Sequence, residues 1–371
     1  MEFLAVLWDY VLPFLVILTV LVFVHELGHY WVARRCGVRV EVFSVGFGPE
    51  LLGWTDKADT RWKISAIPLG GYVKMFGEGE MSGEGEAPRP LTPAERLVSF
   101  RYKSLGRRAA IVFAGPAANF IFAVIVLAGL YVSLGQPFTP AEIATVVEDS
   151  AAEKAGLKPG DVIVRIAGEE MESFEQVQQK IRMIPEQTVE LVVTRDGIEQ
   201  AFSVKPRLRE FKDRLGNVVR IGLLGVTREG KTEVRQLGFV SAIWQAILET
   251  KTITVRTLEA VGQIITGSRS SDELGGPIKI AQMSGEVWKM GVLSLVYFTA
   301  LISINLGLIN LFPIPMLDGG HLMFFAFEAI RGRPLGERVQ EYGFRIGLVL
   351  VLSLMLFVII NDLVNLPIWN T

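Results

Sequence analysis

The sequence predicts a polytopic α-helical membrane protein with about four spans, a membrane-associated β-hairpin or sheet region and one extracytoplasmic α+β domain. Half of its 371 residues are hydrophobic, and its mean hydropathy is +0.39. These apolar residues are concentrated in runs that are long enough to cross a bilayer. Between the runs lie stretches with the two-residue alternation of β-strands. The net charge of −2 gives no support for a nucleic-acid partner.

Residues 1–36 are predicted to form the first span, which carries an H-E-x-x-H pattern from His25 to His29. Two histidines four residues apart share one face of a helix and can bind one metal ion. Glu26 is then placed to take a proton from the attacking water. His25 precedes Arg34 by nine residues, which puts it about 13 Å inside that end of the span. This depth lies within a hydrocarbon core about 30 Å thick.

The alternative interpretation of this pattern is a cytoplasmic helix end that holds two histidines by chance. The whole chain contains three histidines, and two of them are in the pattern. Ionisable groups inside a span are costly and indicate a functional site by default. The metal interpretation is therefore favoured.

Residues 37–77 are predicted to form the membrane-associated β region. Residues 38–42 and 61–67 alternate in polarity, and glycine–proline turns follow both of them. Residues 78–104 begin with a glycine- and glutamate-rich stretch that has no apolar period, and they are expected to form a mobile cytoplasmic loop.

Three further apolar runs predict three further spans. Residues 105–135 form the second span, in which Asn119 is interpreted as a polar residue that packs helices together. Residues 291–333 form the third span, which must be broken, because about 40 residues are too many for one simple helix and Pro313 interrupts the run. Residues 340–365 form the fourth span. Broken backbone at membrane depth is tolerated where it is buried in protein or lines a cavity.

Residues 140–207 are predicted to form a small α+β domain. Ser150 and Ser173 each precede a short helical stretch as N-caps. The Asp196–Gly197 pair between two strand-like stretches indicates a hairpin. Residues 208–290 are expected to form amphipathic extracytoplasmic helices and a loop.

Basic residues predict the orientation, because cytoplasmic loops carry an excess of Lys and Arg. The basic residues that flank the predicted spans are Arg34, Arg35, Arg39, Arg101, Lys103, Arg107, Arg108, Arg331, Arg333, Arg338 and Arg345. If all of them face the cytoplasm, both chain termini and the 140–207 domain lie outside it.

The two histidines need a third metal ligand. Two histidines and one carboxylate, with one position left open, are typical of catalytic zinc sites. Asp318 is the preferred candidate over His321, because an acid without a basic neighbour in an apolar segment is costly unless a cation compensates it. The implied reaction is peptide hydrolysis inside the membrane. Asn310 either hydrogen-bonds a substrate backbone or caps a helix C-terminus, and the sequence does not choose between these roles.

The chain resembles the bacterial site-2 proteases of the regulator-of-sigma-E type, and the resemblance covers nearly all of it. The matching motifs are H-E-L-G-H at 25–29, G-F-G-P at 46–49, G-G-Y-V at 70–73, A-G-P-A-A-N-F at 114–120, G-G-P-I at 275–278 and N-x-x-P-x-P-x-L-D-G at 310–319. The resemblance implies that the 140–207 domain is a PDZ domain. It also implies that His25, His29 and Asp318 bind Zn²⁺ and that Glu26 is the catalytic base.

The same resemblance implies substrates and a location. Its members cleave transmembrane segments of single-pass membrane proteins, such as anti-sigma factors after a first cut, or signal-peptide remnants, in the bacterial inner membrane. The PDZ-like domain would be periplasmic and the active site would lie near the cytoplasmic side. An exposed strand edge could hold the unwound substrate by β-augmentation, and the residues expected to do so are Gly70, Gly71, Tyr72 and Val73. One departure is that some members carry two PDZ domains, for which residues 208–240 are too few.

Two other classes of protein use similar elements. A transporter also combines broken helices with intramembrane acids, but the sequence has no internal repeat and only about four spans. An inactive membrane scaffold that displays a PDZ domain would have no use for an intact H-E-x-x-H pattern. Bound zinc together with cleavage of a model transmembrane substrate would separate the three.

Overall fold

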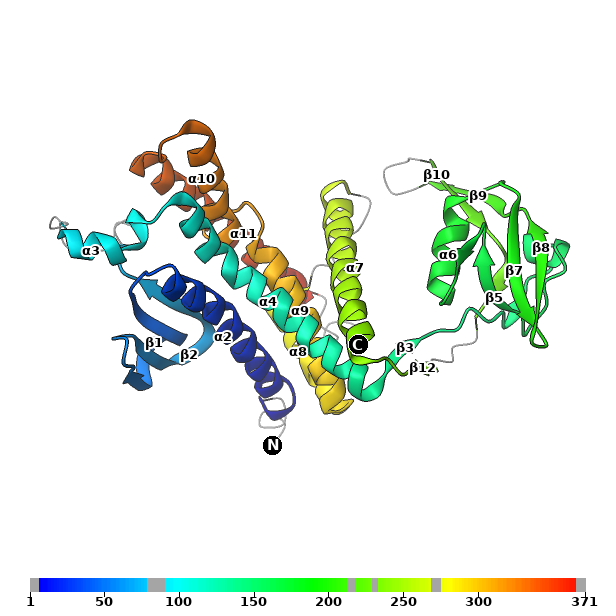
Figure 1. Ribbon diagram of the computed structural model, residues 1–371, viewed down its shortest axis with the longest axis horizontal. Helices are drawn as coiled ribbons and strands as arrows, with labels where there is room; N and C mark the ends of the chain where they lie inside the picture. The colour runs from blue at the N-terminus through cyan, green and yellow to red at the C-terminus, as the bar shows by residue number, and fades with distance from the viewer. Residues whose placement is uncertain (1–6, 79–90, 213–217, 229–232, 268–274, 365–371) are drawn as a thin grey trace. The chain divides into compact units, whose positions relative to one another are not determined.

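The computed structural model describes residues 7–78, 91–212, 218–228, 233–267 and 275–364. The chain divides into two compact units (Figure 1). The first, called here the helical unit, comprises Met1–Gly129, Ile243–Glu259 and Ser271–Thr371. The second, called here the β-rich unit, comprises Leu130–Ala242 and Ala260–Ser270.

The helical unit is built mainly from long helices, and two of them, α4 and α7, run on into residues of the other unit. The helices are η1 (Leu7–Val11), α2 (Leu12–Arg35), α3 (Pro93–Val98), η3 (Phe100–Tyr102), α4 (Leu105–Leu134), α7 (Phe239–Ile265), α8 (Pro277–Lys289), α9 (Val292–Asn310), α10 (Asp318–Arg331) and α11 (Glu337–Val364). Among the described residues, four helical stretches are long and apolar enough to cross a membrane: Trp8–Arg35, Leu105–Leu134, Val292–Asn310 and Arg338–Val364. Their number agrees with the predicted four spans.

The α2 helix packs tightly against two other apolar helices. A Cβ atom at Gly28 would lie 2.3 Å from the carbonyl oxygen of Ala114, so glycine permits the close approach of α4. On the side of α9, Ile17 and Leu21 are buried with Phe298. Because close packing fixes side-chain positions, the histidines of α2 are held on a rigid framework.

The predicted β region is a sheet of two long antiparallel strands, β1 (Val40–Thr55) and β2 (Arg61–Met75). The register pairs residues 42–45 with two separate parts of β2, residues 61–64 and residues 71–74. Residues 61–64 have a second partner in residues 52–55, whereas residues 71–75 have one partner each. Among the described residues, the last part of β2 is therefore an edge of the sheet.

The prediction that residues 78–104 form a loop without regular structure is wrong for the part that the structure describes. Residues 79–90 lie outside the described residues. The chain that follows them forms α3 and η3. The Thr92 side chain accepts a hydrogen bond from the backbone of Glu95, and the Glu95 side chain accepts one from the backbone of Thr92. This capping box stabilises the start of α3.

The β-rich unit contains most of the short strands. They are β3 (Gln136–Phe138), β4 (Thr145–Val146), β5 (Val162–Ile166), β6 (Glu169–Glu170), β7 (Val189–Arg195), β8 (Ile198–Val204), β9 (Arg207–Lys212), β10 (Val218–Leu223), β11 (Val226–Thr227) and β12 (Glu233–Arg235). The four-stranded sheet has the order β6-β5-β7-β8. The same unit contains two short helices, α5 (Ala151–Lys154) and α6 (Phe174–Met183). Ser150 and Ser173 are the N-caps, as predicted.

Two boundaries drawn from the sequence need correction. The α+β domain does not end at residue 207, because Leu224 is buried in its core and β11 pairs with β4. Residues 208–290 are not helical throughout, because β9 to β12 occupy the first part of that range. The strands β9 and β10 form a hairpin with each other. The hydrophobic period within a segment does not by itself reveal pairing of this kind.

Candidate metal centre

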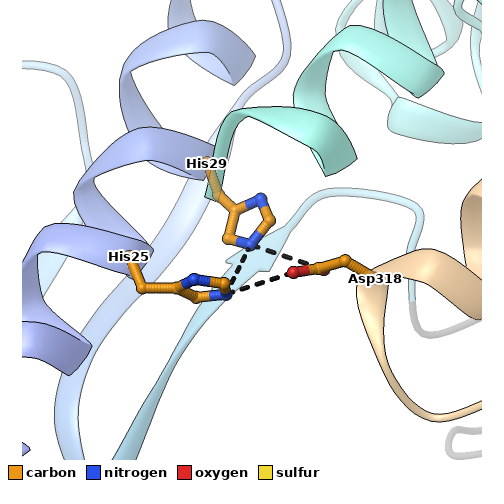
Figure 2. A group of neighbouring side chains, drawn as sticks. All are labelled: His25, His29 and Asp318. Atoms are coloured by element: carbon orange, nitrogen blue, oxygen red, sulfur yellow. Dashed lines mark hydrogen bonds and ion pairs between the residues drawn. The ribbon is translucent and has the colours of Figure 1, made fainter. Parts of the chain in front are cut away.

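Three side chains from two helices converge in the helical unit, as Figure 2 shows. His25 and His29 come from α2, and Asp318 is the first residue of α10. The two histidine Nε2 atoms are 3.2 Å apart. Asp318 Oδ2 lies 3.2 Å from His25 Nε2, and Asp318 Oδ1 lies 3.5 Å from His29 Nε2. In a tetrahedral zinc site with bonds of about 2.0–2.1 Å, neighbouring ligand atoms are about 3.3 Å apart, so these separations fit zinc.

Hydrogen bonding around the three side chains also fits a cation. His29 Nδ1 lies 2.9 Å from the carbonyl oxygen of Ile111. A carbonyl can only accept, so Nδ1 carries the proton and Nε2 of the neutral ring presents a lone pair. That lone pair faces a carboxylate oxygen, and Asp318 Oδ2 is buried without a hydrogen-bond donor among the described residues. A positive ion between these atoms would satisfy the converging lone pairs.

The break between α9 and α10 delivers Asp318 to this place. Gly319 and Gly320 sit in the first turn of α10 so close to the preceding loop that a Cβ atom at Gly319 would lie 2.2 Å from the carbonyl oxygen of Phe312. Met316 has a φ of 98°, which is unusual for a residue with a side chain. The two glycines and the bent loop bring the first turn of α10 against its own connection, and this position places the Asp318 carboxylate toward α2.

A cavity of about 910 Å³ opens beside the three side chains. The sequence-predicted residues that line it are His25, Glu26, His29, Gly71, Tyr72, Val73, Asn310 and Asp318. Gly70 is not among the lining residues, and a Cβ atom there would lie 2.4 Å from the ring of Phe47. Its φ of 148° is one that glycine adopts most readily, so Gly70 permits the irregular backbone of β2 between Ile67 and Gly71.

The edge of β2 runs past Glu26. A Cβ atom at Gly71 would lie 3.2 Å from Glu26 Cγ and 2.7 Å from Val22 Cγ1, so glycine lets the strand lie directly against α2. Tyr72 and Val73 continue this edge along the cavity. Among the described residues, this part of β2 therefore has an unpaired edge close to Glu26.

Two other polar residues in the cavity have distinct surroundings. Asn310 is the last residue of α9, and the helix is capped by the backbone of Leu311. His321 also lines the cavity, with its ring 5.2 Å from that of Phe344. His321 is not part of the group whose ligand atoms lie within 4.8 Å of one another, which among the described residues is His25, His29 and Asp318.

Sequence reasoning missed the contribution of α4. Ile111, Gly115 and Asn119 are spaced by four residues and therefore share one face of that helix. The carbonyl of Ile111 holds His29, a Cβ atom at Gly115 would lie 2.1 Å from His29 Nε2, and Asn119 Nδ2 lies 3.3 Å from His25 Nδ1. Asn119, predicted as a helix-packing residue, therefore also contacts a histidine of the candidate metal centre. The four-residue spacing of His25 and His29 recurs in Ile111, Gly115 and Asn119. This shared spacing was the signal that could have indicated the contact.

The sequence matches the model of peptidase family M50 over residues 13–354. The chain belongs to this family, the site-2 proteases. It is 42% identical over 365 residues to "Putative zinc metalloprotease Atu1380" of Agrobacterium fabrum, a match that covers 97% of each chain. It is 35% identical over 373 residues to "Metalloprotease MmpA" of Caulobacter vibrioides, with 94% of each chain covered. This M50 protein is a zinc metalloprotease with membrane-spanning helices.

Among solved structures, a PDZ domain of an SdrC-like protein from Listeria monocytogenes covers 24% of this M50 protein and 88% of its own chain. The identity is 20% and the TM-score is 0.20. The PDZ character of the α+β domain stays a prediction from the sequence resemblance.

Proposed function

We propose that this M50 protease hydrolyses peptide bonds within transmembrane segments of single-pass membrane proteins, as part of regulated intramembrane proteolysis. Substrates of this class are anti-sigma-like proteins after a first cut, or signal-peptide remnants. The observation that carries the proposal is the convergence of His25, His29 and Asp318 with Glu26 in one cavity among apolar helices. A site at this depth is suited to peptide bonds that lie in the bilayer.

In this proposal His25, His29 and Asp318 hold the zinc ion. Zinc, when bound, supplies Lewis-acid chemistry: it polarises a peptide carbonyl and makes a water molecule easier to deprotonate. Glu26 takes the proton of the attacking water and later gives it to the leaving amide nitrogen. Glu26 is suited to this role because it lines the same cavity as the three ligands without belonging to their group.

The edge of β2 presents the substrate in the proposal. A transmembrane helix keeps its peptide bonds hydrogen-bonded, so it must unwind before an active site can reach them. Residues 71–75 have backbone partners on one side only among the described residues, and an unwound segment can pair with the other side. Asn310 also lines the cavity and is available to hydrogen-bond the substrate backbone.

Replacement of Glu26 by glutamine tests the catalytic assignment. Glu26→Gln keeps the volume of the side chain but removes the base, so cleavage should fall by about 10²–10⁴-fold. Zinc content should stay at the wild-type level, because Glu26 is not a ligand. The measurement is cleavage of a model transmembrane substrate by the protein purified in detergent, together with metal analysis. Wild-type turnover in the variant would remove Glu26 from the mechanism.

We also propose that the protein lies in the bacterial inner membrane with residues 34–108 on the cytoplasmic side and the α+β domain on the periplasmic side. The support is the distribution of basic residues around the spans. Cys36 is the single cysteine and is a free thiol. It should resist a membrane-impermeant thiol reagent in cells with a permeable outer membrane, and react after the inner membrane is opened.

A matched variant carries its single thiol on the proposed periplasmic side. In a Cys36→Ala background, Glu170→Cys places an exposed thiol on the α+β domain, and it should react before the inner membrane is opened. Labelling of Cys36 under the same conditions would reverse the proposed orientation.

A further inference from the structure

Asn119 is a fully buried amide beside a proposed zinc ligand. The residue lies on α4 and has no solvent exposure. Its side-chain nitrogen is 3.3 Å from His25 Nδ1. Its side-chain oxygen, Oδ1, is buried and has no hydrogen-bond partner among the described residues. A buried polar atom without a partner is destabilising, so the amide calls for an explanation.

The hydrogen-bonding requirement of the His25 ring determines which atom of the Asn119 amide should face it. Its Nε2 points to the ligand group, 3.2 Å from both His29 Nε2 and Asp318 Oδ2. A neutral imidazole that binds a metal through Nε2 carries its proton on Nδ1. That N–H requires an acceptor, and the amide nitrogen of Asn119 is itself a donor. The oxygen and nitrogen of an amide are assigned from the hydrogen bonds around them, and turning the amide over gives the unpartnered oxygen its donor.

We propose that Asn119 is a positioning residue for the metal centre: its amide oxygen accepts the Nδ1–H of His25 and fixes the ring with Nε2 toward the metal. The inference rests on the proposed ligand set of His25, His29 and Asp318. It gives the two histidines parallel supports on α4, because the Ile111 carbonyl accepts from His29 in the same way. Metal-binding histidines generally donate their second N–H to such a partner.

A separate contact accounts for the packing of this part of α4. Ser303 on α9 donates a hydrogen bond from its hydroxyl to the backbone carbonyl of Asn119, at 2.8 Å. This bond joins α4 to α9 and makes no use of the Asn119 side chain. Helix packing and histidine positioning can therefore be removed one at a time.

The test is a zinc competition titration with a chelating dye on the purified full-length protein in detergent. Asn119→Leu removes the acceptor and should raise the Kd for zinc by about 10–100-fold. Asn119→Asp keeps an oxygen of the same reach and should bind zinc within about threefold of the wild type or more tightly, since a carboxylate is a common partner of metal-bound histidine. Ser303→Ala is the matched control, and its Kd should equal that of the wild type even if its melting temperature falls.

Each result decides the inference. Wild-type zinc affinity in Asn119→Leu would overturn it. So would an Asn119→Asp protein as weak as Asn119→Leu, because that pattern assigns the effect to the amide nitrogen or to packing. Should Asn119→Leu fail to fold, Asn119→Asp measured against the wild type and Ser303→Ala still decides by whether the affinity is kept. His25→Ala belongs in the same series: unchanged zinc affinity there would overturn the ligand set itself, whereas lost affinity there with an unaffected Asn119→Leu overturns the role of Asn119 alone.

Discussion

Two aspartates in the helical unit, Asp318 and Asp362, lie among apolar helices in opposite electrostatic situations. Asp362, on α11, accepts three hydrogen bonds from backbone N–H groups at the start of α8: Gly276 at 2.9 Å, and Ile278 and Lys279 at 3.1 Å. Asp318 faces two histidine nitrogens, and its Oδ2 has no donor among the described residues.

The difference separates a structural acid from the acid that we propose as a metal ligand. The first N–H groups of a helix have no partner within the helix, and their dipoles favour a negative charge. Asp362 supplies that charge, so its contacts are complete without any ion. In the proposed site, a cation completes the contacts of Asp318. The donors around each carboxylate therefore distinguish these two acids.

Substitution of Asp318 should give the largest effect, and His321 offers the matched control. Asp318→Asn removes the negative charge that compensates the cation, so the protein should lose most of its zinc. Its activity should fall at least on the order of 100-fold, the upper end of what loss of a residue supporting a ligand costs. His321→Ala, three residues along α10, should keep its zinc and lose less than about tenfold in activity.

Zinc content per protein in the two purified variants checks this prediction. Zinc retained by Asp318→Asn but lost by His321→Ala would exchange the two roles. That result would also mean that Asp318 is not the metal-binding acid in the comparison with Asp362.

Substitution of Asp362 should affect stability and leave the metal in place. Asp362→Asn keeps one oxygen acceptor but loses the charge and the second oxygen, on which the N–H groups of Ile278 and Lys279 depend. Hydrogen bonds to charged groups contribute about 1.5–3 kcal/mol, so the free energy of unfolding should fall by roughly that amount. Thermal unfolding in detergent measures the change, and zinc analysis accompanies it. Zinc loss as large as that of Asp318→Asn would show that the two acids do not differ as argued.

The sequence predicted a role for Asp318 but none for Asp362. Asp318 could be singled out because it is an acid without a basic neighbour that follows a proline break in an apolar run, and because the H-E-x-x-H pattern, recognisable by itself, lacks a third ligand. Asp362 gave no such signal, because its partners lie more than 80 residues earlier, at Gly276 and beyond. Asn119 was underestimated for the same reason, since its partner His25 is 94 residues away.

The fold shows the same limit. The four long apolar helices could be predicted from the residues within each of them. The double pairing of residues 42–45 in the β region and the packing of Leu224 into the α+β domain could not. Both depend on which distant segments meet, and a hydrophobic period does not carry that information.

A third acid, Asp161 in the β-rich unit, is fully buried. It extends the comparison to a carboxylate whose main hydrogen-bond donor is another side chain. Arg195 donates two hydrogen bonds to its carboxylate, at 2.6 and 2.7 Å, and the backbone N–H of Lys158 donates a third at 2.8 Å. Burial by itself raises the pKa of Asp161, but the hydrogen bonds from Arg195 and from the Lys158 backbone outweigh it and hold the pKa below its ordinary value. The ionised carboxylate is therefore the form that stabilises the fold.

This third acid should give the smallest effect, one that is confined to the β-rich unit and depends on pH. Because the folded pKa is lowered, the stabilisation is fully present above the pKa of the unfolded chain, about 3.9, and is lost as the pH falls through the folded pKa. Asp161→Asn should therefore destabilise the unit by about 1–3 kcal/mol at pH 7 and by less at pH 3. Hydrogen exchange of the β7–β8 segment in the full-length protein, at pH values between 7 and 3, measures this difference. Zinc binding should be unchanged at neutral pH. A difference in exchange rates between variant and wild type that stays constant over the pH range would mean that the Asp161 charge is not what stabilises the unit.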